Sequence, residues 1–83
     1  MSKEDNVKKI IEEYRFAQSQ NFDSIVIVIE TTGGEYTISE YEDGFINDNL
    51  EGVYSDIEEI AEDVLSLISM RQDRIEGFRI EWF

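Results

Sequence analysis

The segment from Ser24 to Glu40, SIVIVIETTGGEYTISE, determines the fold more than any other part of the chain. Five β-branched residues follow one another from Ile25 to Ile29, which favours a strand that is covered on both faces or lies centrally in a sheet. The Gly33-Gly34 pair favours a tight turn because positive φ costs glycine little, and the residues after it alternate between polar and apolar. The segment therefore predicts a β-hairpin.

Two further segments extend this hairpin into a larger sheet. Glu42-Asp43-Gly44 is a second turn signal, and Phe45-Ile46 after it predicts a short third strand that completes a meander. Near the end of the chain, apolar residues alternate with other residues over about Ile75 to Trp82, which predicts a last strand. Periodicity does not say where this last strand pairs.

Two amphipathic helices are predicted, one on each side of the meander. From Ser2 to about Gln18 apolar residues recur at helical spacing, and Ser2 with Asp5 forms a weak capping pair. Ser55-Asp56-Ile57-Glu58 matches a capping box with Ser55 as the N-cap, and an apolar stripe then runs as far as Met70. The chain therefore predicts one α+β domain, residues 1–83, in the order α-β-β-β-α-β, with one antiparallel or mixed sheet and two helices packed on it.

The composition agrees with a folded domain and argues against several kinds of site. Apolar residues make up 41% of the chain and aromatic residues 12%, more than is typical of acidic disordered segments. The chain has no Cys and no His, which removes disulfides, thiolates and the usual ligands of zinc, haem and iron–sulfur clusters. It carries no phosphate-binding glycine motif, nucleophile elbow or metalloprotease signature, so we predict no cofactor and no enzymatic activity.

The sequence also lacks the patterns of secretion and membrane insertion. Its first residues are charged, and the longest apolar run, Ile25 to Ile29, is far shorter than the roughly 20 residues that cross a bilayer. We therefore expect a soluble protein without membrane contact. The absence of disulfides favours a reducing cytoplasm, which would be the host cytoplasm if the protein is encoded by a phage.

Charge is distributed very unevenly along the chain. Twenty Asp and Glu against seven Lys and Arg give a net charge of −13. No Lys or Arg occurs between Phe16 and Met70, although thirteen acids do, while the two flanks hold seven acids and all seven bases. The net charge therefore belongs to the middle of the chain. Ten of these acids fall in one stretch: Glu40, Glu42, Asp43, Asp48, Glu51, Asp56, Glu58, Glu59, Glu62 and Asp63.

Such a stretch favours a surface that binds a basic partner, because complementary potential speeds encounter and suppresses wrong partners. Acids four apart on a helix lie about 5–6 Å apart at Cβ, comparable to the several-ångström spacing of nucleic-acid phosphates. We therefore predict a mimic of DNA that occupies the groove of a basic nucleic-acid-binding protein. Tyr41 and Tyr54 lie within the acidic stretch and would act as aromatic anchors. The few, balanced bases argue against direct nucleic-acid binding by the chain itself.

The strand, glycine turn and Glu-Tyr-Thr-Ile-Ser-Glu continuation between Ile25 and Glu40 resemble the hairpin of a small acidic phage-encoded anti-CRISPR protein that inhibits the type II effector nuclease. The resemblance covers about a fifth of the chain. It implies that Glu40, Glu42 and Asp43 occupy the nuclease groove that reads duplex DNA. The chain differs from that family in its predicted C-terminal strand.

Other interpretations of the same residues remain open. On one alternative interpretation the acids only confer solubility, and the protein is a cytosolic adaptor or structural protein. The loop that starts at Asn47 partly follows the spacing of a calcium-binding loop, with Gly52 at position 6 and Glu58 at position 12. The chain is expected to be a monomer or a homodimer, with Phe83 as a possible dimer contact, and most aromatic residues are expected to lie in the core.

Overall fold

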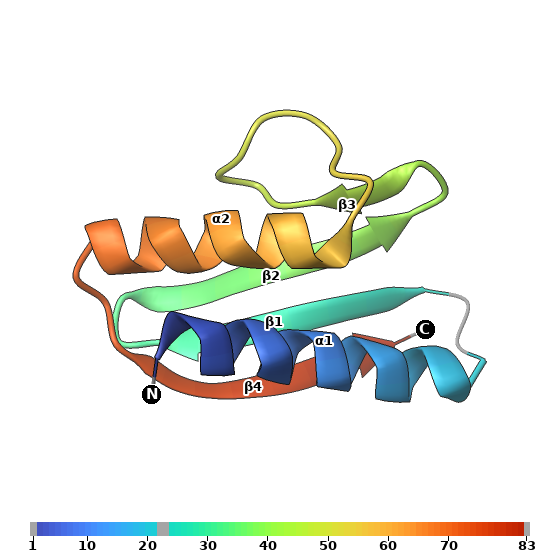
Figure 1. Ribbon diagram of the computed structural model, residues 1–83, viewed down its shortest axis with the longest axis horizontal. Coiled ribbons are helices and arrows are strands. Elements are labelled where there is room, and N and C mark those ends of the chain that lie inside the picture. Colours follow the sequence, from blue (N-terminus) through green and yellow to red (C-terminus); the bar gives the residue numbers. More distant parts are fainter. Residues whose placement is uncertain (1, 22–23, 83) are drawn as a thin grey trace.

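The computed structural model describes residues 2–21 and 24–82, and this part of the chain confirms the predicted α+β fold and element order (Figure 1). Each element lies within two residues of its predicted place. The elements are α1 (Lys3–Ser19), β1 (Ile25–Thr31), β2 (Gly34–Tyr41), β3 (Gly44–Ile46), α2 (Ile57–Met70) and β4 (Ile75–Trp82).

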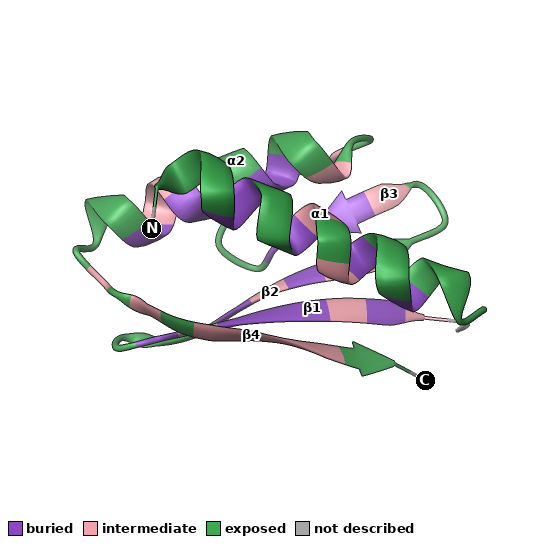
Figure 2. Ribbon diagram, turned by 60° about the horizontal axis from the view of Figure 1, so that its bottom comes forward, coloured by how far each residue is buried: buried purple, intermediate pink, exposed green. Residues whose placement is uncertain are grey.

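The described strands form one antiparallel sheet in the order β3-β2-β1-β4. The meander accounts for β1, β2 and β3, and β4 pairs with the free edge of β1, which puts β1 in the interior of the sheet. Both helices lie on the same face of the sheet (Figure 2). α1 contacts β1 and β4, and α2 contacts β2 and β3. The molecule therefore has two layers, with the other face of the sheet open.

The core lies between the helices and the sheet. Ile27 and Ile29 of β1 point into it and are 1% and 0% exposed, and they join a cluster that includes Ile10 of α1 and Ile60 of α2. Val28 points to the open face, yet it is only 2% exposed. The unbroken β-branched run is thus explained by a strand that is buried on both faces, although helices cover one of them.

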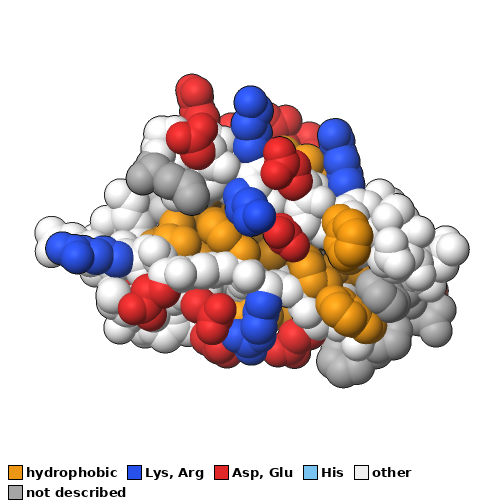
Figure 3. All heavy atoms as spheres, turned by 90° about the horizontal axis from the view of Figure 1, so that it is seen from below, with side chains coloured by type: hydrophobic (Ala, Val, Ile, Leu, Met, Phe, Trp, Pro, Cys, Tyr) orange, Lys and Arg blue, Asp and Glu red, His pale blue; other side chains and the backbone are white. Residues whose placement is uncertain are grey.

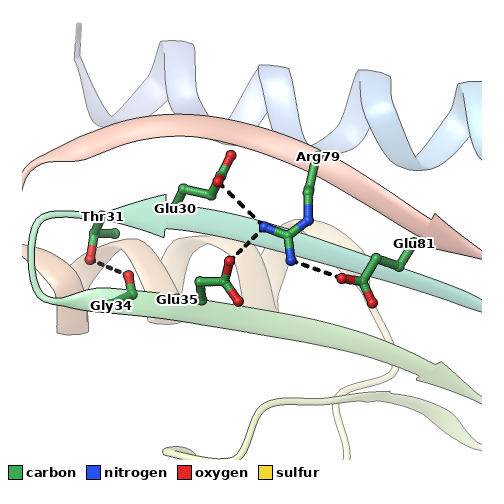
Figure 4. A network of polar contacts seen from close by, with 6 residues as sticks. All are labelled: Glu30, Thr31, Gly34, Glu35, Arg79 and Glu81. Carbon is green, nitrogen blue, oxygen red and sulfur yellow. Dashed lines mark hydrogen bonds and ion pairs between the residues drawn. The ribbon is translucent and has the colours of Figure 1, made fainter.

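The Arg79 side chain covers the open face of the sheet at Val28. Arg79 and Val28 are directly paired across β4 and β1. The guanidinium reaches across β1, where it lies 3.4 Å from Glu30 and 2.6 Å from Glu35 on β2, and it also pairs with Glu81 at 2.8 Å (Figure 4). The aliphatic part of Arg79 must therefore pass over β1, which shields Val28 from water.

The two helices differ in how well their starts were predicted. Ser2 caps α1 as expected, since its hydroxyl accepts a hydrogen bond from the Asp5 amide at 3.2 Å. The predicted capping box of α2 is wrong. Asp56, and not Ser55, is the N-cap, and its carboxylate accepts from the Glu58 amide at 3.0 Å. Asp56 is as good a cap as serine, and its charge also favours the positive end of the helix dipole.

Two glycines lie close to other parts of the chain, and at Gly44 the neighbour is backbone that cannot easily move. A Cβ on Gly33, in the β1–β2 turn, would lie 2.3 Å from the Asp73 carboxylate. A Cβ on Gly44 would lie 2.2 Å from the carbonyl oxygen of Tyr54, and the φ of Gly44 is 142°. The β1–β2 turn is also joined to the segment before β4, where the Thr32 amide donates to the Arg74 carbonyl at 2.9 Å.

Candidate partner-binding surface

The acidic stretch folds into three segments that Tyr54 holds together: the β2–β3 turn, the loop after β3 and the first half of α2. Tyr54 and Phe45 of β3 exchange two backbone hydrogen bonds, of 2.7 and 2.8 Å. The Tyr54 hydroxyl donates to the Asp63 carboxylate on α2 at 2.6 Å. In Figure 1 all three segments lie along the upper side of the molecule, away from β4.

The loop after β3 is fixed at its start by a buried asparagine. Asn47 is 1% exposed, and its amide nitrogen donates to the Thr37 carbonyl of β2 at 2.7 Å. Its side-chain oxygen accepts from the Asn49 amide at 2.8 Å. With Asn47 at one end and Tyr54 at the other, the loop holds Asp48 and Glu51 on the surface, where both are exposed.

Six exposed carboxylates share this side of the molecule, and we call them the acidic face. Within residues 2–21 and 24–82, none of these carboxylates forms an ion pair with Lys or Arg. Asp63 accepts a hydrogen bond from the uncharged Tyr54 hydroxyl. Their charge is therefore presented to solvent. The acidic face consists of Glu42, Asp43, Asp48, Glu51, Glu59 and Asp63.

The carboxylates of the acidic face raise the pKa of Tyr54. The hydrogen bond to Asp63 raises the pKa of the Tyr54 hydroxyl, and partial burial and the negative charges of Asp63 and Glu59 raise it further. A tyrosinate there would add a negative charge beside two carboxylates, so the hydroxyl keeps its proton and remains a donor. Tyr54 thus orients Asp63, and its half-buried side chain packs against the hydrophobic core.

Glu40 does not belong to the acidic face, although the sequence placed it there. It points to the helix-covered side of the sheet, where its carboxylate accepts a hydrogen bond from the hydroxyl of Tyr14 on α1. Burial, followed by this bond and the charge of Glu40, raises the pKa of Tyr14 to about 12. The Tyr14 ring also makes an edge contact with Phe45 at 5.2 Å between centroids. Glu40 therefore joins α1 to β2.

Three further predicted acids have a local environment that differs from the acidic face. Asp56 caps α2. Glu58 and Glu62 line a groove between the two helices, and α1 contributes Lys3, Lys8 and Glu4 to the same groove. These two acids stand beside positive charge, so the helix pairs Glu58/Glu62 and Glu59/Asp63 do not contribute equally to a negative surface.

The aromatic residues were predicted only in part. Tyr36 and Phe45 lie in the core as expected, but Tyr41 is 59% exposed beside the β2–β3 turn, next to Glu42. Tyr54 is half-buried, as its role between the loop and α2 requires. Trp82 is 50% exposed. Phe83, considered as a dimer contact, lies outside the described residues.

Sequence patterns indicated only in part what the residues that organise this surface do. Tyr14 and Glu40 are far apart along the chain, but Glu40 shares the alternation of Tyr36 and Ile38, which does place it on the core side of β2. Asn47 was considered only as the first ligand of a calcium loop. Its buried side chain is instead bonded to the backbone at both its polar atoms.

Within residues 2–21 and 24–82 no group of three or more acids is arranged to hold a metal ion. Neither of the described helices has the length and apolar character needed to cross a membrane. Comparison of the chain with protein-family models, curated proteins and solved structures finds no match.

Proposed function

We propose that this protein is an inhibitor, encoded by a phage or another mobile element, that binds a basic nucleic-acid-binding protein by mimicking DNA. Its acidic face would occupy the groove in which the partner otherwise holds phosphates. The observation that carries the proposal is the exposure of six carboxylates on one side of the fold, without Lys or Arg partners in the described part of the chain. A partner that binds DNA already carries the matching Lys and Arg side chains.

The way in which the acidic face is built supports this mechanism. Asn47 and Tyr54 fix the two ends of the acidic loop, and Asp63 is fixed by Tyr54. Fixed charges lose less conformational entropy on binding than mobile side chains and loops do. Tyr41, which is exposed beside the β2–β3 turn, would add aromatic contact area at the border of the acidic face.

Within this class we propose a CRISPR effector nuclease as the partner. The support is the resemblance of the Ile25–Glu40 hairpin to that of a small acidic anti-CRISPR protein. Glu42 and Asp43, at the tip of the β2–β3 turn, would enter the site where the nuclease contacts duplex DNA. Glu40 takes no part in this version of the mechanism, because its carboxylate is bonded to Tyr14.

The experiment uses a guide-loaded type II effector nuclease as the probe. We expect the chain to bind it, to inhibit cleavage of double-stranded DNA, and to bind more weakly as salt is added, because the contacts are between exposed charges. The triple variant Glu42→Lys, Asp43→Lys, Glu51→Lys should lose inhibition. The control variant Glu4→Lys, Glu12→Lys, Glu76→Lys makes the same change in net charge outside the acidic face and should keep it.

Two results would contradict the proposal. Equal loss in both triple variants would mean that net charge matters and the acidic face does not. If the nuclease does not bind, a capture from bacterial lysate at low and moderate salt tests the broader class of partner. DNA- or RNA-binding proteins retained by the wild type and released by the acidic-face variant would support the broader class, and their absence would reject the mimic.

A second candidate function has its own support. Glu40 and Asp56 make structural hydrogen bonds, and Glu58 and Glu62 lie beside lysines, so four of the ten predicted acids already have a role within the fold. On this interpretation the protein is an adaptor or structural protein whose acids provide solubility. It predicts that both triple variants keep every partner and differ from the wild type only in solubility.

A further inference from the structure

The two edges of the sheet are protected to different degrees. β3 forms one edge and is three residues long, and its outer side is already bonded to Tyr54 through two backbone hydrogen bonds. β4 forms the other edge and runs for eight residues, with β1 as its strand partner in the described part of the chain. An edge strand of this length offers a row of N–H and C=O groups to another strand.

The surface around β4 differs in character from the acidic face. Figure 3 views the molecule from below Figure 1, the side on which β4 lies, and hydrophobic side chains are open to view there among side chains of both charges. Trp82 of β4 and Phe16 of α1 are 50% and 62% exposed. Phe78 and Ile80 are partly buried against the core. This side therefore presents both charge signs and exposed apolar surface to a second copy, whereas the acidic face presents carboxylates.

We propose that β4 pairs in antiparallel fashion with β4 of a second copy, about a two-fold axis that passes through Ile80. The two sheets then form one continuous sheet with the helices of both copies on the same face. In this register Arg79 lies opposite Glu81 of the second copy, and Phe78 lies opposite Trp82 of the second copy. Two-fold symmetry makes each of these pairs occur twice.

Residues on the two faces of β4 suit this register well. On the open face, Arg79 and Glu81 of the two copies lie directly opposite each other with opposite charges, while Arg79 keeps its ion pairs with Glu35 and Glu81 of its own chain. On the helix face, Phe78 meets Trp82, which adds aromatic contact and buries exposed apolar surface. Opposite charges and aromatic pairs directly across two antiparallel strands are both stabilising.

Other symmetric registers do not match in this way. An axis through Arg79 places the two guanidinium groups opposite each other, and an axis through Glu81 does the same with two carboxylates. An axis through Phe78 places Ile80 opposite Glu76 of the second copy. Like charges directly opposite each other are destabilising. The charge pattern of β4 therefore selects the axis through Ile80.

The proposed dimer does not depend on the proposed function. Added salt distinguishes them, because it should have opposite effects on dimerisation and on binding of a basic partner. Each chain carries a net charge of −13, so two copies repel each other at long range and salt should favour dimerisation by screening this repulsion. Binding of a basic partner should respond in the opposite direction. We expect sedimentation equilibrium of the full chain to give a dimer whose dissociation constant falls as salt rises. A chain that stays monomeric at millimolar concentration and high salt would overturn the proposal.

Two matched variants test the register. Glu81→Arg turns both Arg79–Glu81 pairs between the copies into repulsive pairs and should raise the dissociation constant of the dimer by roughly tenfold or more. Glu76→Arg makes the same change in charge on the same strand, but lies outside the paired residues 78–82, so the dimer should persist. An unchanged dimer in Glu81→Arg, or equal weakening in both variants, would overturn the register.

Hydrogen exchange tests the β4 contact on the wild-type chain, so this test does not depend on whether a variant folds. Amide hydrogen exchange in residues 78–82 should slow as protein concentration rises, because the outward N–H groups of β4 become bonded to the second copy. Exchange in β3, residues 44–46, should not depend on concentration. A concentration dependence at β3 and none at β4 would place the contact elsewhere and reject this dimer.

Discussion

The hydroxyl of Tyr14 holds the Glu40 carboxylate on the helix-covered side of the sheet. Tyr14 is 8% exposed and donates to Glu40, which lies on the helix-covered side of β2. We expect Tyr14→Phe to lower the free energy of unfolding by about 1–2 kcal/mol, because Glu40 loses its donor in a partly buried site. Tyr41→Phe removes an exposed hydroxyl and should change it by less than about 0.5 kcal/mol. Urea denaturation measures both, and equal effects would contradict the role of Tyr14.

The same tyrosine should make stability depend on pH in the alkaline range. The pKa of Tyr14 is raised from 10.0 to about 12, so between these values the folded chain holds a proton that the unfolded chain has released. The free energy of unfolding should therefore fall as pH rises from about 10 to 12, and the contribution is fully present below pH 10. Subtracting the profile of Tyr14→Phe isolates this contribution, and parallel profiles would show that it does not exist.

At the scale of elements, the start of α2 depends on Asp56. Its carboxylate accepts the Glu58 amide, whereas Ser55, the residue that the capping pattern favoured, is not the N-cap. We expect Asp56→Ala to lower the free energy of unfolding by about 1 kcal/mol and Ser55→Ala to have little effect. Thermal or chemical denaturation of the two variants decides between the caps. The reverse order would restore the capping box predicted from the sequence.

The open face of the sheet depends on Arg79 in a comparable way. Glu30 and Glu35 are direct neighbours across β1 and β2, and Arg79 forms ion pairs with both of them and with Glu81, so its positive charge offsets part of their mutual repulsion. Arg79→Gln should lower the melting temperature more than Lys9→Gln, which breaks one ion pair within α1, because it leaves like charges opposite each other. The difference between the variants should shrink in about 1 M NaCl, where the Debye length is about 3 Å.

The stability of the fold in acid tests the ion pair between Arg79 and the Glu35 carboxylate. The hydrogen bond from Arg79 lowers the pKa of Glu35 below 4.5. Its stabilising contribution is therefore present above about pH 4.5 and is lost as pH falls through the lowered pKa. In Arg79→Gln this part of the pH dependence should disappear. A profile that is the same with and without Arg79 would show that the ion pair does not stabilise the fold.

Periodicity predicted the elements well because each carries its own pattern of apolar residues. The helices, the hairpin and the last strand follow from spacing within short segments such as Ile25–Ile29. Strand order does not, and the pairing of β4 with β1 depends on how the helices and strands fit together. The N-cap of α2 was misplaced by one residue because Ser55 and Asp56 are both good caps. Tyr54, which pairs with Phe45 just before them, is a contact that a local pattern does not encode.

For the whole molecule, the charge segregation seen along the chain becomes a segregation in space. The acidic face lies on the β3 side, while β4 and its surroundings carry both charge signs (Figures 1 and 3). The uneven positions of the charges along the sequence predicted an acidic surface formed by ten acids, and six of these ten lie exposed on the acidic face. The alternation of β2 does place Glu40 on the core side, but its hydrogen bond with Tyr14 and the groove that Glu58 and Glu62 line with lysines depend on how α1 packs.

Concentrated charge should also make the stability of the fold depend on salt. Like charges on one side repel each other in the compact state, and added salt screens this repulsion, so the melting temperature should rise with NaCl. The triple variant Glu42→Gln, Asp43→Asn, Glu51→Gln removes three charges that make no hydrogen bond within the described residues. It should raise the melting temperature at low salt by roughly 5 °C, which corresponds to about 1 kcal/mol, and should flatten the salt dependence.

The matching control removes three charges from α1, where acids alternate with lysines. Glu4→Gln, Glu12→Gln, Glu13→Gln changes the net charge by the same amount, but Glu13 pairs with Lys9 at 3.0 Å. This variant should therefore be no more stable than the wild type, and its salt dependence should stay steep. If calorimetry shows that both triple variants stabilise the fold equally, repulsion is spread over the whole surface. The concentrated negative potential on which partner binding depends would then be absent.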